Sequence, residues 1–267
     1  MLYHAKNAVL DLNGNKMNYL SFGSGNRNLI ILPGLGDGLK TVKGMALPFA
    51  FLYRSLAKDF KVYAFSRKEA LEDTAGTKEM AQDVKCAMDQ LGIERASVLG
   101  VSMGGMIAQH LAALYPERIE KLILTVTIPK SNEMLDGIIL HWLELSEQRD
   151  IKQLLIDTSE RTYTGKQLEQ YRLCYPLLAL YPKPKSFRRF QIMARACMTH
   201  NATDLLKQIS AETLVIGAAK DQIVGVKGSI ELAEAIPNAR CHIYEQYGHG
   251  VYDESNDFQK RVLDFLK

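Results

Sequence analysis

The chain is poor in the residues that cross-link small or metal-dependent folds. Its 267 residues include four cysteines and one tryptophan. The cysteines form no C-x-x-C pair and lie far apart, at Cys86, Cys174, Cys197 and Cys241. This spacing argues against a disulfide framework and against a cysteine-held metal. We therefore expect buried, reduced thiols and no metal site.

Long apolar segments and an excess of one charge are also missing. No run approaches the roughly 18 apolar residues of a membrane span, and residues 1–6 do not begin a basic-then-apolar signal peptide. The formal net charge is only +3, with basic and acidic residues mostly interspersed, which gives no case for nucleic-acid binding. We predict a cytoplasmic protein with no membrane or nucleic-acid partner, and we leave its oligomeric state open.

What is present is the composition of a globular α/β protein. Hydrophobic residues make up 47% and charged residues 24% of the chain, enough to bury a substantial core. Residues 1–25 predict a β-hairpin that turns at Asn13-Gly14, because both residues tolerate positive φ. Beyond the hairpin, short apolar runs alternate with helical patterns, which predicts a parallel sheet covered on both faces.

Six apolar runs predict the strands of this sheet. They cover residues 29–32, 61–65, 96–101, 122–127, 213–216 and 241–244. Apolar residues at helical spacing predict helices over 77–91, 103–115 and 253–266. This alternation is typical of a doubly covered α/β core.

One interval interrupts the alternation. From about residue 131 to 206 only helical patterns occur, over 135–145, 151–163, 167–180 and 186–198. An insertion after the fourth of the six strands would lie over the carboxyl edge of the sheet, where α/β sheets bind ligands. We therefore predict a core of residues 1–130 and 207–267 with a helical cap of residues 131–206.

The strongest chemical signal is a serine between a predicted strand and a predicted helix. Ser102 lies in the sequence Gly-Val-Ser-Met-Gly-Gly, directly after the strand over residues 96–101. A sharp turn there raises the hydroxyl above the sheet edge and needs small neighbours, which Gly100 and Gly104 supply. We interpret Ser102 as the nucleophile of a strand-turn-helix elbow; the alternative is a glycine-rich turn with a bystander serine.

A serine nucleophile needs a base and an acid that orients the base. Of the six histidines, His249 alone follows a predicted strand in a glycine-flanked loop at the same sheet edge as Ser102. Asp221 leaves the end of the neighbouring predicted strand, whereas Asp253 and Asp257 fit better as charges in the first turn of the last helix. We predict His249 as the base and Asp221 as the acid, although a turn-forming aspartate is also a common use of that residue.

The order serine, aspartate, histidine is that of the α/β-hydrolases. With the segments 102–106, 116–118 and 248–249, the chain resembles the α/β-hydrolase superfamily, specifically its small capped esterase and enol-lactonase-like members. The resemblance covers essentially the whole core. It implies a mostly parallel central sheet with an antiparallel N-terminal hairpin, helices on both faces and an inserted helical cap.

The same resemblance implies an oxyanion hole made of two backbone amides. In that family the loop after the first core strand usually opens with His-Gly, and the next amide is one donor; by position this is Leu35, and Met103 supplies the other. Pro33 stands in place of the usual histidine, which leaves the bracing of this loop open. A second departure is Ser-Arg-Lys-Glu at 66–69, where the family commonly has Asp-x-Arg-Gly.

Substrate contacts are less specific. The segment 183–195 carries five basic and no acidic residues, namely Lys183, Lys185, Arg188, Arg189 and Arg195. These form either a solvated helix face or a handle for an anionic substrate group. Aromatic residues of the cap either line an acyl pocket or simply pack. The candidate substrate-binding residues are Lys40, Lys43, Trp142, Tyr175 and Arg188, with Tyr171 and Tyr181 as further aromatic candidates.

These features predict a cofactor-independent serine hydrolase, in the manner of a carboxylesterase, that cleaves a small and possibly anionic ester through an acyl-enzyme. Thioesters, lactones and carbon–carbon bonds are open to the same triad, because the fold does not choose the bond. A slowly turning ligand sensor with the same residues is a further alternative.

Overall fold

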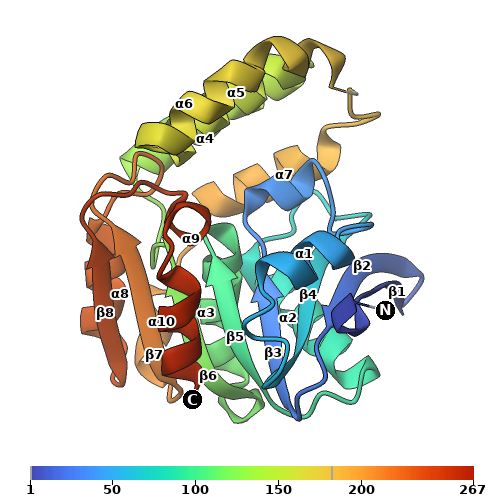
Figure 1. Cartoon of the computed structure of the whole chain (residues 1–267), viewed down its shortest axis with the longest axis vertical. Coiled ribbons are helices and arrows are strands. Elements are labelled where there is room, and N and C mark those ends of the chain that lie inside the picture. Colours follow the sequence, from blue (N-terminus) through green and yellow to red (C-terminus); the bar gives the residue numbers. More distant parts are fainter. Residues whose placement is uncertain (1, 182) are drawn as a thin grey trace.

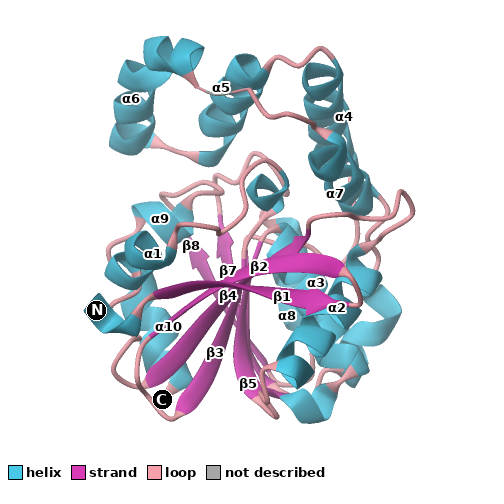
Figure 2. Cartoon of the chain, turned by 90° about the vertical axis from the view of Figure 1, so that its right-hand side faces the viewer, coloured by secondary structure: helices cyan, strands magenta, loops and turns pink. Residues whose placement is uncertain are grey.

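The protein is described here by a computed structural model that covers residues 2–181 and 183–267. Its centre is an eight-stranded sheet in the order β1-β2-β4-β3-β5-β6-β7-β8 (Figures 1 and 2). The strands are β1 (Lys6–Leu12), β2 (Asn15–Phe22), β3 (Arg27–Leu32), β4 (Phe60–Lys68), β5 (Ala96–Val101), β6 (Ile119–Thr125), β7 (Glu212–Ala218) and β8 (Ala239–Tyr244). β1 and β2 pair antiparallel, as do β2 and β4, and every pairing from β4 through β8 is parallel. The predicted fold class is confirmed.

The N-terminal hairpin turns where the sequence predicts. Asn13 and Gly14 both adopt positive φ, 57° and 82°, the conformation that a tight two-residue hairpin turn requires. Gly14 N–H also donates to the Asp11 side chain at 2.5 Å. The turn chemistry therefore fixes the register of β1 against β2.

Helices cover both faces of the sheet. Their bounds in the core are α1 (Ala46–Leu52), α2 (Thr77–Gln90), α3 (Met103–Leu114), α8 (Lys227–Ala235), α9 (Val251–Glu254) and α10 (Phe258–Leu266). Short 3₁₀ segments lie at Leu2–His4, Leu35–Gly38 (η2) and Pro116–Arg118, and a longer one at Thr203–Gln208 runs from the insertion into the core. Within β3, Ile30 packs with α2, α3 and α8, whereas Leu29 and Ile31 pack with α1 and α10. This alternation of one strand between two cores is the period of two expected for a buried strand. Among the described residues, no helix is long and apolar enough to cross a membrane.

The last helix is the main error in the predicted elements. A single helix over 253–266 is wrong, because α9 ends at Glu254 and α10 begins at Phe258. The Ser255 hydroxyl donates to the Asp257 carboxylate at 2.6 Å, a local bond that competes with helix continuation. Apolar spacing was preserved across the break, so periodicity alone did not reveal it.

Residues 131–206, which we call the helical insertion, contain no strand among those described. Its helices are α4 (Glu133–Glu147), α5 (Ile151–Thr162), α6 (Gly165–Cys174) and α7 (Arg188–Met198), with a 3₁₀ segment at Tyr175–Leu180. The predicted helix over 167–180 is thus α-helical only to Cys174. In Figures 1 and 2 the insertion lies beyond one end of the sheet, with α7 nearest to it. Lys130, just before the insertion, pairs in an isolated β-bridge with Asn201, near the end of the insertion.

The cysteine prediction is only partly right. All four thiols are free, but only Cys197 is buried, and burial raises its pKa to about 12. Cys241 is exposed because it lies on β8, the last strand of the sheet. Cys86 and Cys174 occupy exposed positions on helices.

Candidate active site

Ser102 occupies a strained turn between β5 and α3. Its φ of 53° and ψ of −120° are unfavourable for a residue with a side chain. The flanking glycines allow the turn, because a Cβ on Gly104 would lie 1.9 Å from the Leu32 carbonyl oxygen and one on Gly100 would lie 2.5 Å from the Gly104 oxygen. The strand-turn-helix context predicted for Ser102 is therefore present.

The neighbouring strand holds this turn by its backbone. Ser102 N–H donates to the Thr125 carbonyl at 2.9 Å, and the Thr127 hydroxyl donates to the Ser102 carbonyl at 2.8 Å. Between these two partners, Val126 has φ of 43°, a second strained conformation beside the serine. Thr127 was not predictable as a support, because it is the last residue of the predicted strand over 122–127. That strand end is wrong, since β6 ends at Thr125.

Asp221 and His249 are brought together as predicted. His249 Nδ1 lies 2.8 Å from Asp221 Oδ2, and both side chains are buried. Asp221 Oδ1 accepts two backbone N–H bonds, from Ile223 at 2.8 Å and from Val224 at 3.0 Å. The carboxylate is therefore fully engaged, with one oxygen on the imidazole and one on its own loop.

The electrostatics of the pair favour an ionised Asp221. Burial opposes the charge, but the interaction with His249 and the two amide bonds outweigh it, so the pKa of Asp221 lies below its ordinary value. A carboxylate in this state fixes the proton of His249 on Nδ1 and leaves Nε2 free to accept one. The arrangement fits a base held in a single tautomer.

Two backbone amides of the predicted oxyanion hole have no acceptor among the described residues. Leu35 N–H lies at the start of η2 and Met103 N–H at the start of α3, and neither donates a hydrogen bond within these residues. Gly34 brings the two loops together, because a Cβ there would lie 3.4 Å from the Ser102 Cβ. Free amides at this point are suited to receive an anionic oxygen.

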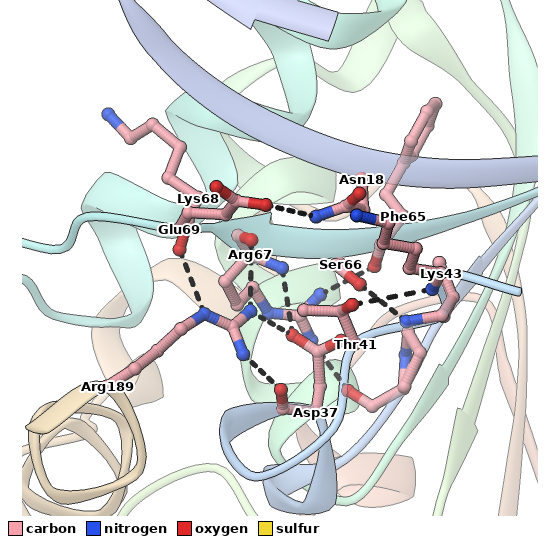
Figure 3. Close-up of polar contacts among 12 residues, drawn as sticks. Asn18, Asp37, Thr41, Lys43, Phe65, Ser66, Arg67, Lys68, Glu69 and Arg189 are labelled. Carbon is pink, nitrogen blue, oxygen red and sulfur yellow. Dashed lines mark hydrogen bonds and ion pairs between the residues drawn. The ribbon is translucent and has the colours of Figure 1, made fainter. Parts of the chain in front are cut away.

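The bracing that the sequence left open comes from Arg67. Its Nη2 donates to the Pro33 carbonyl at 2.6 Å. Its backbone N–H donates to Asp37 Oδ2 at 2.9 Å (Figure 3). Arg67 is 1% exposed, and burial lowers its pKa to about 10. The two positions at which the sequence differs from the family pattern, Pro33 and segment 66–69, are thus joined by a hydrogen bond from Arg67 that holds the loop.

A cavity of about 460 Å³ joins these groups to the insertion. Ser102, His249 and Leu35 line it, and so do Lys40 and Trp142 of the predicted substrate contacts. Most of the remaining lining is apolar or aromatic and includes Met106, Leu135, Ile139, Leu155, Tyr163, Tyr171, Tyr181, Phe190, Ile223 and Tyr252. The cavity lies between the carboxyl edge of the sheet and the helical insertion.

Three predicted substrate contacts are not at this cavity. The half-exposed Arg188 side chain donates to exposed Asp73 at 2.9 Å, and the Tyr175 hydroxyl donates to Glu160 at 3.0 Å. Lys43 is exposed on the loop before α1 and is not part of the lining. Long side chains reach whichever carboxylate is within range, which spacing along the chain cannot reveal.

The basic segment of α7 is also largely paired. Arg189 forms an ion pair with Asp37 at 2.5 Å, and Arg195 lies 3.9 Å from Glu147. Neither residue lines the cavity, and Arg195 is half exposed. None of the five basic residues of segment 183–195 is among the residues that line the cavity.

The histidine loop contacts the insertion as well. Gly250 N–H donates to the Thr162 carbonyl at 2.6 Å, and Thr164 N–H donates to the Glu254 carboxylate at 2.7 Å. Gly248 permits this packing, because a Cβ there would lie 3.0 Å from Thr164. The insertion thus supports the loop that carries His249 as well as covering the cavity.

Outside the cavity, two buried histidines face each other where the insertion joins the core. His110 and His200 lie edge to face with ring centroids 5.3 Å apart, and Thr77 Oγ1 is 2.9 Å from His200 Nδ1. Burial lowers the pKa of both, to about 3 for His200. Neither His110 Nδ1 nor His200 Nε2 has a partner among the described residues, and these residues contain no cluster of three or more potential metal ligands.

Comparisons with known proteins agree with this architecture. The family model described as "alpha/beta hydrolase fold" matches residues 27–255. The 2-hydroxy-6-oxo-6-phenylhexa-2,4-dienoate hydrolase of Comamonas testosteroni is 27% identical over 98% of this chain and 95% of its own length.

Two solved structures are similar over nearly their whole length. The enol-lactonase of Burkholderia xenovorans superposes with a TM-score of 0.79 at 24% identity, covering 97% of this chain and 99% of that one. An esterase of Exiguobacterium antarcticum superposes with a TM-score of 0.80 at 20% identity, covering 98% and 99%. At these identities the structures establish the fold alone, and the bond cleaved is a separate question.

Proposed function

The chain belongs to the alpha/beta hydrolase fold family, and from that premise we propose that it is a cofactor-independent serine hydrolase that cleaves a small carboxylic ester. The observation that carries the proposal is the buried pair of His249 and Asp221 at 2.8 Å, sharing one sheet edge with the strained Ser102. Ser102 is the nucleophile, His249 the base and Asp221 the residue that orients the base.

The chemistry proceeds in two acyl transfers. Ser102 Oγ attacks the ester carbonyl as His249 Nε2 takes its proton, and the amides of Leu35 and Met103 stabilise the oxyanion. His249 then gives that proton to the departing alkoxide, leaving an acyl-serine. A water molecule, deprotonated by His249, attacks the acyl group and releases the acid with Ser102 restored.

The cavity supports a substrate with an uncharged, apolar portion. Several of its polar side chains are already bonded within the protein: Thr158 and Ser159 to helix carbonyls, Trp142 to Asp157, and Tyr171 to Tyr163. A ligand therefore meets mostly methyl groups and ring faces, which is favourable for an acyl or alkyl chain. We propose that residues 131–206 act as the cap over this chain.

Carbon–carbon bond cleavage is the second candidate, and the relatives favour it. The Comamonas testosteroni protein is named for a dienoate, a carboxylate-bearing compound. A buried carboxylate needs a paired cation, and of the basic residues predicted to bind an anion only Lys40 lines the cavity, with an exposed side chain. This scarcity of cations is why we place the neutral ester first. Thioesters and lactones remain alternative substrates for the same residues. A ligand sensor that hydrolyses its ligand slowly would be recognised by near-stoichiometric turnover.

The test combines labelling with a substrate panel. A fluorophosphonate should modify Ser102, located by peptide mass spectrometry, and Ser102→Ala should abolish both labelling and hydrolysis of p-nitrophenyl butyrate. Neutral esters should turn over many times and faster than a 2-hydroxy-6-oxo-dienoate. Labelling of a different residue, or full activity in Ser102→Ala, would refute the nucleophile; faster cleavage of the dienoate would make carbon–carbon hydrolysis the function.

A further inference from the structure

Arg189, on the α7 helix of the insertion, binds two segments of the core with one guanidinium group. Its Nε donates to the Lys68 carbonyl at 2.9 Å and its Nη2 to the Arg67 carbonyl at 2.9 Å, both at the end of β4. The same group binds Asp37 in η2 twice, through the carbonyl oxygen and through Oδ2, the latter at 2.5 Å (Figure 3). A planar fork with several fixed donors makes such a bridge possible; a lysine has no such fork.

The bridge ends two residues from the predicted oxyanion donor. Asp37 and Leu35 share the single 3₁₀ turn of η2, which the Asp37 N–H closes on the Gly34 carbonyl at 3.2 Å. A turn this short moves as a unit, so a displacement of Asp37 displaces the Leu35 amide.

Packing reinforces the polar contacts. A Cβ on Gly38 would lie 2.8 Å from the Cα of Phe190, the residue after Arg189, so α7 rests directly on the end of η2. The Asp37 side chain is 1% and the Arg189 side chain 13% exposed. Removing the arginine would leave a buried carboxylate whose one remaining hydrogen-bond donor among the described residues is the Arg67 backbone N–H, which disfavours the present loop conformation.

We propose that Arg189 is a positioning residue: from the insertion, it sets the place of the Leu35 N–H in the oxyanion hole. The proposal rests on the function given above, since it needs an oxyanion at Leu35. Arg67 fixes the start of the loop through Pro33, and Arg189 fixes its end through Asp37. The insertion thereby contributes to transition-state stabilisation as well as to substrate enclosure.

The test uses Arg189→Gln, with Arg195→Gln as the matched control. Both substitutions remove one positive charge from α7, but Arg195 faces Glu147 away from the loop. Arg189→Gln should lower kcat for p-nitrophenyl butyrate by about 10²-fold, the cost of a misplaced oxyanion donor. KM should stay close to that of the wild type, because a rise in KM at unchanged kcat would report lost ground-state binding instead. The rate constant of fluorophosphonate labelling should fall in parallel, because that reaction also develops charge on an oxygen in the hole.

A purely structural role for Arg189 gives a different result. The melting temperature would fall, but kcat per labelled Ser102, measured below the melting transition, would equal that of Arg195→Gln. That result overturns the proposal. Arg189→Lys keeps the charge without the fork and should have an intermediate kcat, which keeps the test usable if Arg189→Gln does not fold. Failure of wild-type labelling at Ser102 would instead refute the proposed function itself.

Discussion

The two sides of the candidate active site are held by different parts of the chain. The serine turn is fixed by core elements alone: Gly100 and Gly104 allow it, and Thr125 and Thr127 hold its backbone. The loops that carry Leu35 and His249 are instead fixed partly by the helical insertion, through Arg189 and through 162–164. Ser102, the proposed nucleophile, is therefore held by the sheet, while the loops that carry Leu35 and His249 depend partly on the helical insertion.

This difference separates two kinds of substitution. Substitutions at the core contacts of the serine turn should disturb Ser102 and the stability of the fold together, because the same close contacts serve both. Changes at the insertion should disturb the loops that carry Leu35 and His249 while leaving Ser102 in place. Four predictions test this separation, beginning with the largest expected effect.

Asp221→Asn should abolish most of the catalytic activity while leaving both the core contacts of the serine turn and the insertion contacts of the other two loops in place. An amide cannot hold His249 in the correct tautomer, so kcat for p-nitrophenyl butyrate should fall about 10⁴-fold. The melting temperature should change little by comparison, since Asn can still accept the Ile223 and Val224 amides. Stopped assays at high enzyme concentration would measure the residual rate; a loss under tenfold would remove Asp221 from the triad.

The same substitution, glycine to alanine, can be compared in the core, at Gly104, and in the insertion, at Gly137. At Gly104 the new methyl would lie 1.9 Å from a backbone oxygen, whereas at Gly137, exposed on α4, it meets nothing within 4 Å. We expect Gly104→Ala to lose about 3 kcal/mol or more of unfolding free energy through overpacking. Gly137→Ala should gain about 0.5–1 kcal/mol from helix propensity. Urea titration of both variants measures the difference, and equal stabilities would contradict the described turn.

Acid should weaken the junction between insertion and core. The folded protein keeps His200 neutral, with its pKa lowered to about 3 by burial, while the unfolded chain titrates near the ordinary 6.5. Below pH 6.5 the unfolded state alone binds the proton, so stability is lost as the pH falls toward 3. At pH 5 this cost is on the order of 2 kcal/mol. His200→Gln should flatten the stability curve between pH 6.5 and 4; an unchanged slope would show that His200 is not the group responsible.

Glu254→Ala should loosen only the histidine loop. Its carboxylate accepts the Thr164 N–H at 2.7 Å, and the loss of this bond should cost about 1 kcal/mol. Amide exchange over residues 248–251 should accelerate while that of 102–106 stays slow. Glu245→Ala is the control, because its exposed side chain makes no hydrogen bond in the described part of the chain. Equal acceleration in both loops would mean that the two sides are not held separately.

Local sequence was sufficient for the core strands, for several helices, and for the placement of Ser102, Asp221 and His249 after strands of one sheet. The Asn13-Gly14 turn, the strand over 96–101 and the start of α3 at Met103 lie where turn chemistry and apolar runs place them. The supports of the site were not predictable in the same way. Arg67, Thr127 and Arg189 look like ordinary charged or strand residues, and their partners lie 25 to more than 100 positions away along the chain.

The predicted substrate contacts were also not decided by the sequence. Arg188 and Arg189 are neighbours with the same side chain, yet one pairs with exposed Asp73 and the other with buried Asp37. A helix turns about 100° per residue, so adjacent positions face different partners. No pattern of charges along the chain distinguishes them.

The sequence by itself determined the sheet, the serine turn and the pairing of a late histidine with an aspartate, because these depend on residues close in sequence or on the fixed order of parallel strands. Only the tertiary structure decided which basic residues face the cavity and which hold its walls, because each long side chain binds the carboxylate or carbonyl that folding brings within reach. The cavity that results has one exposed lysine and mostly apolar walls, a property that belongs to the packing of the insertion on the core.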